Sequence, residues 1–206
     1  MRRFVLAVVA FLALSAPGAA FARGGSYVVD GGTAAERSQV HAALEASSFD
    51  WGLVPQTIQV HVAPGGESYS TPGQVYVSAS LLDAGRFAWA TVQHEMGHQV
   101  DFFLLDDAKR ATLNAALGGK DWCYSVPNLP HSDYGCERFA SELSWAYWSS
   151  PDNAMKPSSP RDEAGAMPPA AFRALLAQLI GAPNTVSTNV AAKAFAPATP
   201  KKAKKR

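Results

Sequence analysis

The segment TVQHEMGHQVD, at residues 91–101, restricts what this chain can form more than any other stretch. It carries His94, Glu95 and His98 in the order H-E-x-x-H. If the segment is helical, the four-residue step is about one turn, so both imidazoles point to one side as two ligands of a tetrahedral zinc ion. Glu95 then lies beside the metal, where a carboxylate can take the proton of a metal-bound water as the water attacks a carbonyl. The segment therefore predicts a catalytic zinc site.

The residues around this motif have the spacing of a helix with two faces. Gly97 costs about 1 kcal/mol of helix propensity relative to alanine, which we expect where something approaches the backbone closely. One face presents the two histidines and the other is apolar. The apolar face consists of Trp89, Val92, Met96, Val100 and Phe103. This pattern disfavours the alternative, a surface helix that carries two histidines by chance.

A catalytic zinc site needs a third protein ligand besides the two histidines. The candidates downstream are Asp101, His131, Glu137 and Glu142. Asp101 lies further along the same helix, where side chains converge poorly on one ion, so we expect it to support the site rather than bind the metal. Glu137 and Glu142 share a later predicted helix and lie roughly 140° apart around its axis, so at most one of them faces the metal. The residues alone leave this choice open.

The motif and a later segment together resemble a known family. HEMGHQVD, followed by an E-x-F-A segment that starts at Glu137, resembles the gluzincin branch of the zincin metallopeptidases, and most closely the catalytic domain of anthrax lethal factor-type proteins. The resemblance covers roughly residues 74–148. It implies a zincin-like fold in which His94, His98 and Glu137 bind zinc and Glu95 is the catalytic base.

The family also places a tyrosine shortly before the third ligand, where its hydroxyl can hydrogen-bond the oxyanion. Tyr134 is the nearest match and lies three residues before Glu137, closer than in lethal factor. Ser141 stands where that relative has an acidic residue. Tyr134 is thus a candidate catalytic residue, with plain packing as the alternative and His131 as the substitute donor.

The order of elements along the chain predicts an α/β (α+β) domain with a small twisted sheet packed on the ligand-bearing helix. A capping-box pattern begins a first helix, alternating apolar residues mark a strand, and a hairpin precedes the ligand helix. We expect helices at residues 34–46, 85–105, 106–117, from 137, and at 170–180, a strand at 58–62 and a hairpin at 69–78. We interpret the second hairpin strand, at residues 74–78, as an edge that an extended peptide can pair with.

The N-terminal end predicts export. Residues 1–22 combine two arginines, an apolar run too short to span a membrane, and a small-x-small cleavage pattern, as in a signal peptide. We therefore expect a secreted protein in the periplasmic or extracellular space, with its catalytic domain at residues 23–180. In such an oxidising compartment, Cys123 and Cys136 are expected to form a disulfide.

Charge separates the domain from the C-terminal end. Residues 23–180 contain ten basic and 17 acidic side chains, whereas residues 181–206 contain six basic and no acidic ones. The tail lacks helical or strand periodicity, so we expect it to be disordered. It is either a solvated end without consequence or a weak contact to an anionic surface. We expect no nucleic-acid partner, and a monomer.

Together these patterns predict a secreted zinc-dependent endopeptidase that acts on a protein or peptide substrate. The alternative from another class is a non-catalytic exported binding protein on a zincin scaffold, with a structural or lost zinc site. Glu95 favours the enzyme, because a structural zinc site fills its fourth position with protein and has no use for a base.

Overall fold

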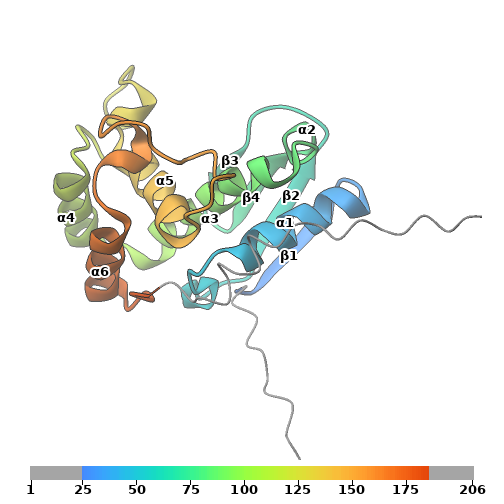
Figure 1. The fold of residues 1–206 in the computed structure, drawn as a ribbon, viewed down its shortest axis with the longest axis horizontal. Coiled ribbons are helices and arrows are strands. Elements are labelled where there is room, and N and C mark those ends of the chain that lie inside the picture. The colour runs from blue at the N-terminus through green and yellow to red at the C-terminus, as the bar shows by residue number, and fades with distance from the viewer. Residues whose placement is uncertain (1–24, 186–206) are drawn as a thin grey trace, which may run out of the picture.

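The computed structural model describes residues 25–185, which form a mixed α and β structure (Figure 1). The predicted signal peptide at residues 1–22 lies outside the described residues, and so does the predicted tail from residue 186 onward. The first five residues of that tail, 181–185, are described, and Ala182 among them is buried. Within the described range, no helix combines the length and the apolar character that crossing a bilayer requires.

A four-stranded mixed sheet forms one part of the fold, and its strands are β1 (Tyr27–Gly31), β2 (Ile58–Ala63), β3 (Tyr69–Thr71) and β4 (Gln74–Ser78). Their order in the sheet is β1-β2-β4-β3. β2 is parallel to both β1 and β4, and β3 runs antiparallel to β4 as the predicted hairpin. In β2 and β4, the valines at alternate positions are buried against the helices, as the period of two requires.

The predicted edge strand at residues 74–78 is not an edge. β4 lies between β2 and β3, so its backbone groups already pair on both sides. The interpretation that a substrate pairs with this strand is therefore wrong. The outer strand on this side is β3, which is too short to show a clear alternating pattern in the sequence.

Six α-helices complete the described fold, and with the sheet they confirm the predicted α+β class. They are α1 (Ala34–Ala46), α2 (Ala79–Leu82), α3 (Trp89–Leu104), α4 (Asp107–Leu117), α5 (Gly135–Tyr147) and α6 (Pro169–Ile180). α1 has the predicted bounds, because the capping box forms between Thr33 and Glu36. A separate 3-10 turn, Gly85–Ala88, precedes α3 where one continuous helix was predicted. β1 and α2, both short, were not predicted.

α3 is the central helix of the fold. It packs against α1 and the sheet on one side and against α5 on the other, with α4 and α6 beyond (Figure 1). A Cβ atom at Gly97 would lie 3.1 Å from Cα of Ala140 on α5. The close approach expected at Gly97 is thus the crossing point of the two helices. This crossing brings the first turn of α5 beside the histidine face of α3.

A disulfide fixes the segment before α5. Cys123 and Cys136 are bonded, as expected. Backbone hydrogen bonds from Gly135 to Asp121 and from Cys136 to Trp122, each 2.8 Å, run beside it. The disulfide therefore holds the preceding loop against the helix start that carries Glu137.

Candidate metal centre

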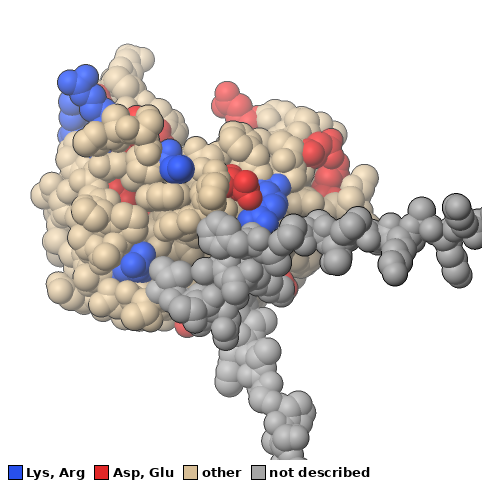
Figure 2. Space-filling view, in the orientation of Figure 1, with Lys and Arg blue, Asp and Glu red and all other residues tan. Residues whose placement is uncertain are grey.

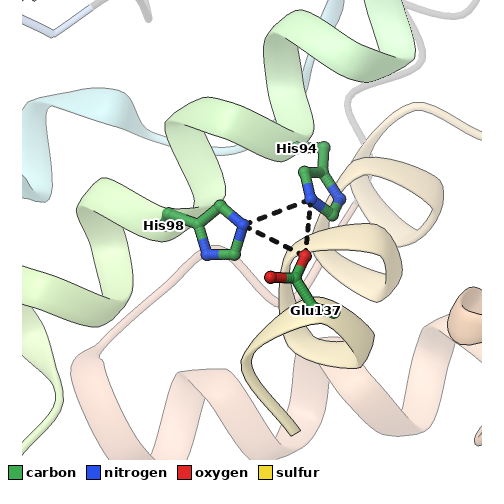
Figure 3. Close-up of side chains that lie close together, drawn as sticks. All are labelled: His94, His98 and Glu137. Carbon is green, nitrogen blue, oxygen red and sulfur yellow. Dashed lines mark hydrogen bonds and ion pairs between the residues drawn. The ribbon is translucent and has the colours of Figure 1, made fainter. Parts of the chain in front are cut away.

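The two motif histidines project from the same side of α3 toward α5 (Figure 3). Nε2 of His94 and Nε2 of His98 are 3.2 Å apart, as expected for a helical step of about one turn. Both side chains are buried, with exposed fractions of 6% and 8%. The helix thus presents two ligand nitrogens to one point.

Glu137 comes to the same point from the first turn of α5. Its Oε2 lies 3.1 Å from Nε2 of His94 and 3.3 Å from Nε2 of His98. The carboxylate is 4% exposed. Among the candidate third ligands, the structure therefore brings Glu137 to the histidines, and the three form a potential metal-binding group.

The spacing of the three atoms fits a zinc ion. Zinc at about 2.0–2.1 Å from each ligand would set neighbouring ligand atoms about 3.3–3.4 Å apart in a tetrahedral arrangement, and the three observed separations are 3.1, 3.2 and 3.3 Å. Hydrogen bonds alone explain this triangle less well. If both imidazoles donate from Nε2 to Glu137, the two N–H groups of His94 and His98 point toward each other, which is unfavourable. A single cation bound by the lone pairs of all three atoms would remove this conflict.

The electrostatics of the group also favour a cation. Burial by itself would raise the pKa of Glu137, but hydrogen bonds from His94 and His98 outweigh it and hold this pKa well below its ordinary value. Burial likewise opposes charging of His98, yet the hydrogen bond with Glu137 prevails and raises the pKa of this imidazole. An ionised carboxylate therefore faces the two rings in a buried site, where a metal would have to displace any proton held by His98.

Glu95 is buried beside the group and is held by the outer strand of the sheet. Ser70 on β3 donates from its hydroxyl to Oε2 of Glu95 at 2.9 Å and also lies 2.8 Å from the backbone carbonyl of Glu95. Glu95 also lines an open pocket of about 520 Å³, together with Ser68, Ser78 and Thr91. The proposed base thus has a fixed orientation and an adjoining space.

Tyr134, the tyrosine chosen from the sequence, has its hydroxyl committed elsewhere. This buried side chain donates to the carbonyl of Val126 at 2.7 Å. The tyrosine whose hydroxyl contacts the group is Tyr124, which donates to Oε1 of Glu137 at 2.8 Å. Burial and this hydrogen bond raise the pKa of Tyr124, so the hydroxyl keeps its proton. The sequence contained a clue, since Tyr124 follows one disulfide cysteine as Glu137 follows the other.

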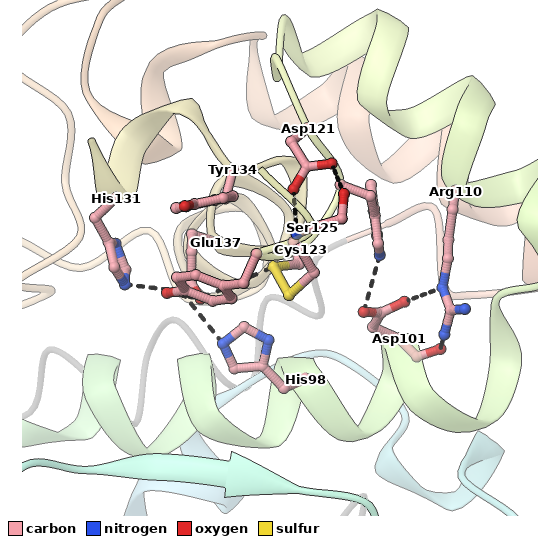
Figure 4. Close-up of a disulfide and its surroundings, with 12 residues drawn as sticks. His98, Asp101, Arg110, Asp121, Cys123, Ser125, His131, Tyr134 and Glu137 are labelled. Atoms are coloured by element: carbon pink, nitrogen blue, oxygen red, sulfur yellow. Dashed lines mark hydrogen bonds and ion pairs between the residues drawn. A yellow bond between two sulfur atoms is a disulfide. The ribbon is translucent and has the colours of Figure 1, made fainter. Parts of the chain in front are cut away.

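His131, the substitute donor, does lie at the group. Its Nε2 is 3.2 Å from Oε2 of Glu137 (Figure 4). Its Nδ1 is 2.6 Å from Oε1 of Glu163. The ring is about half exposed, unlike the buried His94, His98 and Glu137. The hydrogen bond with Glu163 is the main cause that raises the pKa of His131, which favours the doubly protonated ring that can donate from Nε2. Nothing in the sequence pointed to Glu163.

The two other candidate ligands serve the structure. Asp101 is buried and accepts hydrogen bonds from Nε of Arg110 at 2.7 Å and from the indole of Trp122 at 3.1 Å (Figure 4). It thus ties α3 to α4 and to the disulfide loop, as expected for a supporting charge. Glu142 is buried on α5 and accepts from the backbone N–H of Met167 at 2.9 Å. Neither side chain joins the metal-binding group.

Comparison with known proteins found no relative of this chain. No protein-family model, curated protein or solved structure matches the chain significantly, so its assignment rests on the arrangement of His94, His98, Glu137 and Glu95.

Proposed function

We propose that this chain is an exported zinc metalloendopeptidase that hydrolyses peptide bonds. The observation that carries the proposal is the convergence of His94, His98 and Glu137 on one buried point, with Glu95 adjacent in the same helix. Three protein ligands, two nitrogens and one carboxylate oxygen, are the donor set of many hydrolytic zinc sites. The resemblance of the motif and the E-x-F-A segment to gluzincins supports the same assignment.

The chain's own residues divide the chemistry among them. His94, His98 and Glu137 would hold the zinc, which when bound supplies a Lewis acid and lowers the pKa of bound water toward neutrality. Glu95 would accept the proton of the attacking water and pass it to the leaving amine. The hydrogen bond from Ser70 keeps the Glu95 carboxylate in one orientation for this transfer.

Two groups at the site can stabilise negative charge on the substrate carbonyl oxygen. Tyr124 and His131 both contact Glu137, and each would turn its proton from this carboxylate to the substrate oxygen. In this proposal Tyr124 takes the part that the sequence assigned to Tyr134, because the Tyr124 hydroxyl lies at Glu137 whereas the Tyr134 hydroxyl bonds the carbonyl of Val126. Preorganised donors of this kind typically contribute a large share of the rate enhancement in acyl transfer.

A peptide substrate fits the surroundings of the site. β3 is an outer strand of the sheet, and its Ser70 contacts the proposed base, so an extended peptide paired with β3 would run past Glu95. On the face visible in Figure 2, basic and acidic side chains are scattered and do not gather into a patch of one sign. A peptide held through its backbone requires no such patch.

The disulfide supports the proposed location. Disulfides persist in secreted and periplasmic proteins. Cys136 of the Cys123–Cys136 disulfide directly precedes Glu137. We propose export by the predicted signal peptide, and a weak contact of the basic C-terminal tail with an anionic surface.

The decisive test compares Glu95→Gln with the wild type. The variant should bind zinc as the wild type does and lose peptide cleavage by about 100- to 10,000-fold, the usual contribution of a positioned base. Glu142→Gln is the matched control, since this buried glutamate lies outside the group and should leave cleavage unchanged. Cleavage of a peptide mixture would be followed by mass spectrometry. Full activity of Glu95→Gln, or no zinc in the wild type, would refute the proposal.

A further inference from the structure

The second nitrogen of His94 has a partner of its own. While Nε2 faces Glu137, Nδ1 lies 3.0 Å from the hydroxyl of Ser141, which is one turn further along α5 and fully buried. A metal-ligating histidine normally donates its other N–H to an acceptor that fixes the ring and its tautomer. Ser141 occupies the place of that acceptor.

Ser141 is in turn linked to a carboxylate from a distant segment. Its hydroxyl lies 2.8 Å from Oε2 of Glu163, which belongs to the short helix Glu163–Gly165 in the segment before α6. The sulfur of Met155, at 3.5 Å, is a much weaker acceptor. The hydroxyl proton therefore goes to Glu163, and the oxygen lone pairs face His94.

This order of donors fixes the tautomer of the histidine. Because the single proton of Ser141 is used on Glu163, Ser141 can only accept from His94, so Nδ1 carries the hydrogen. The neutral form of this ring therefore leaves the Nε2 lone pair toward His98 and Glu137, which is the form that a metal needs. Without a metal, Nε2 can hold a second proton and donate it to Glu137.

Glu163 also holds a second ring at the site. Its other oxygen, Oε1, receives a hydrogen bond from Nδ1 of His131 at 2.6 Å. Burial by itself would raise the pKa of Glu163, but the hydrogen bonds from His131 and Ser141 outweigh burial and lower it. The ionised carboxylate of Glu163 therefore accepts hydrogen bonds from both Ser141 and His131.

We propose that Ser141 and Glu163 form a positioning pair for His94, in which the carboxylate of Glu163 acts through the hydroxyl of Ser141. The inference rests on the proposed metal site. Lethal factor-type relatives have an acidic residue at the position of Ser141, and here the acid is supplied from the segment between α5 and α6. This segment, residues 149–167, would thus help to orient His94 through Glu163.

The test measures zinc affinity, which does not depend on any substrate. The full chain would be freed of metal and titrated with zinc against a chromophoric chelator. Ser141→Ala and Glu163→Gln should each weaken zinc binding by about 10- to 100-fold, the usual loss when the partner of a ligand histidine is removed. The double variant should be little worse than either single one, because the two residues act as one unit.

Matched controls separate positioning from stability. Ser144→Ala removes another buried serine of α5, whose hydroxyl bonds the carbonyl of Ala90, and should change zinc affinity less than about 3-fold while costing similar stability. Glu142→Gln controls for Glu163→Gln. The combination of Ser141→Asp with Glu163→Gln should recover affinity, because it places a carboxylate directly against His94.

The outcomes distinguish this inference from the proposed function. If the wild type binds zinc and Ser141→Ala behaves like Ser144→Ala, the positioning pair is refuted and the metal site stands. If the wild type does not bind zinc, the proposed function fails and the inference fails with it.

Discussion

The hydroxyl of Tyr124 lies 2.8 Å from Oε1 of Glu137, and each residue directly follows one cysteine of the Cys123–Cys136 disulfide. One covalent bond thus holds both a proposed metal ligand and a proposed catalytic donor. Tyr124 has a positive φ of 59°, an uncommon conformation for a bulky side chain. The loop keeps this conformation while it is tethered to the start of α5.

Removing the hydroxyl of Tyr124 and removing that of Tyr134 should therefore affect catalysis differently. Tyr124→Phe removes the hydroxyl at Glu137 and should lower kcat by about 100-fold, the cost of losing one oxyanion donor. Tyr134→Phe removes only the hydrogen bond to Val126 and should cost about 1 kcal/mol of stability with little change in kcat. Steady-state cleavage of one peptide by both variants tests this. A larger loss of kcat in Tyr134→Phe would restore the sequence-based choice.

Loss of the disulfide should lower kcat, through Tyr124, more than it lowers zinc affinity. The variant with Cys123→Ala and Cys136→Ala should lose about 3 kcal/mol of stability, as expected for a loop of this length. Zinc affinity should change less than about 10-fold, because the ligands and the Ser141 partner come from α3 and α5. We expect kcat to fall as in Tyr124→Phe, since Tyr124 is no longer held at Glu137. Unchanged kcat in a folded variant would show that the disulfide does not position Tyr124.

Zinc should stabilise the fold measurably, since its three ligands join α3 to α5. Free zinc at 1,000 times its dissociation constant should add about 4 kcal/mol to the free energy of unfolding. Urea unfolding with zinc and with a chelator measures this difference. His98→Ala should abolish most of it, because one ligand is lost. Equal stability of the wild type in both conditions would contradict the metal site.

The crossing of α3 and α5 should tolerate little bulk at Gly97. A Cβ there would already lie 3.3 Å from Cβ of Ala140, so the branched side chain of Gly97→Val should push the helices apart. We expect a loss of about 1–3 kcal/mol from overpacking, and weaker zinc binding because Glu137 moves away from the histidines. Ala115→Val is the control, because it adds a branched side chain on the exposed side of α4, away from the crossing. Zinc affinity unchanged in a folded Gly97→Val would argue against this role of the crossing.

Stability should fall between acid and neutral pH because of Glu142. Burial raises the pKa of Glu142 to about 7 from an ordinary value of 4.5, although hydrogen bonds from the backbone of Met167 and Ala166 oppose this. Between these pH values the folded protein keeps a proton that the unfolded chain releases, so raising the pH favours unfolding. The full cost, of order 3 kcal/mol, is reached above pH 7.

Glu142→Gln should remove this pH dependence. The amide oxygen can still accept from Met167, and no charge appears in the core at high pH. The variant should match the wild type near pH 4.5 and be more stable at pH 8, as measured by urea unfolding at both values. A variant less stable than the wild type at pH 8 would show that the ionised carboxylate is favoured in the fold.

The local parts of the structure were accessible from the sequence. The bounds of α1 followed from its capping box, and the shared direction of His94 and His98 followed from their spacing, because backbone geometry alone fixes which side chains share a helix face. The short β1 and α2 were missed, since so few residues carry too little pattern to be recognised. The edge strand was misassigned because strand order depends on contacts between distant segments.

The sequence by itself indicated the two histidines of the metal-binding group, the adjacent Glu95 and the mixed α and β class, all of them set by patterns within one or two turns of chain. The residue pattern left the acid open and the family resemblance pointed to Glu137, which the tertiary structure brings to the histidines. Only the tertiary structure decided that Tyr124 rather than Tyr134 contacts this acid. It also supplied Glu163 from another segment. These choices depend on how α3 and α5 cross at Gly97 and on which loop the disulfide holds against them, and such packing arises between residues far apart in the chain.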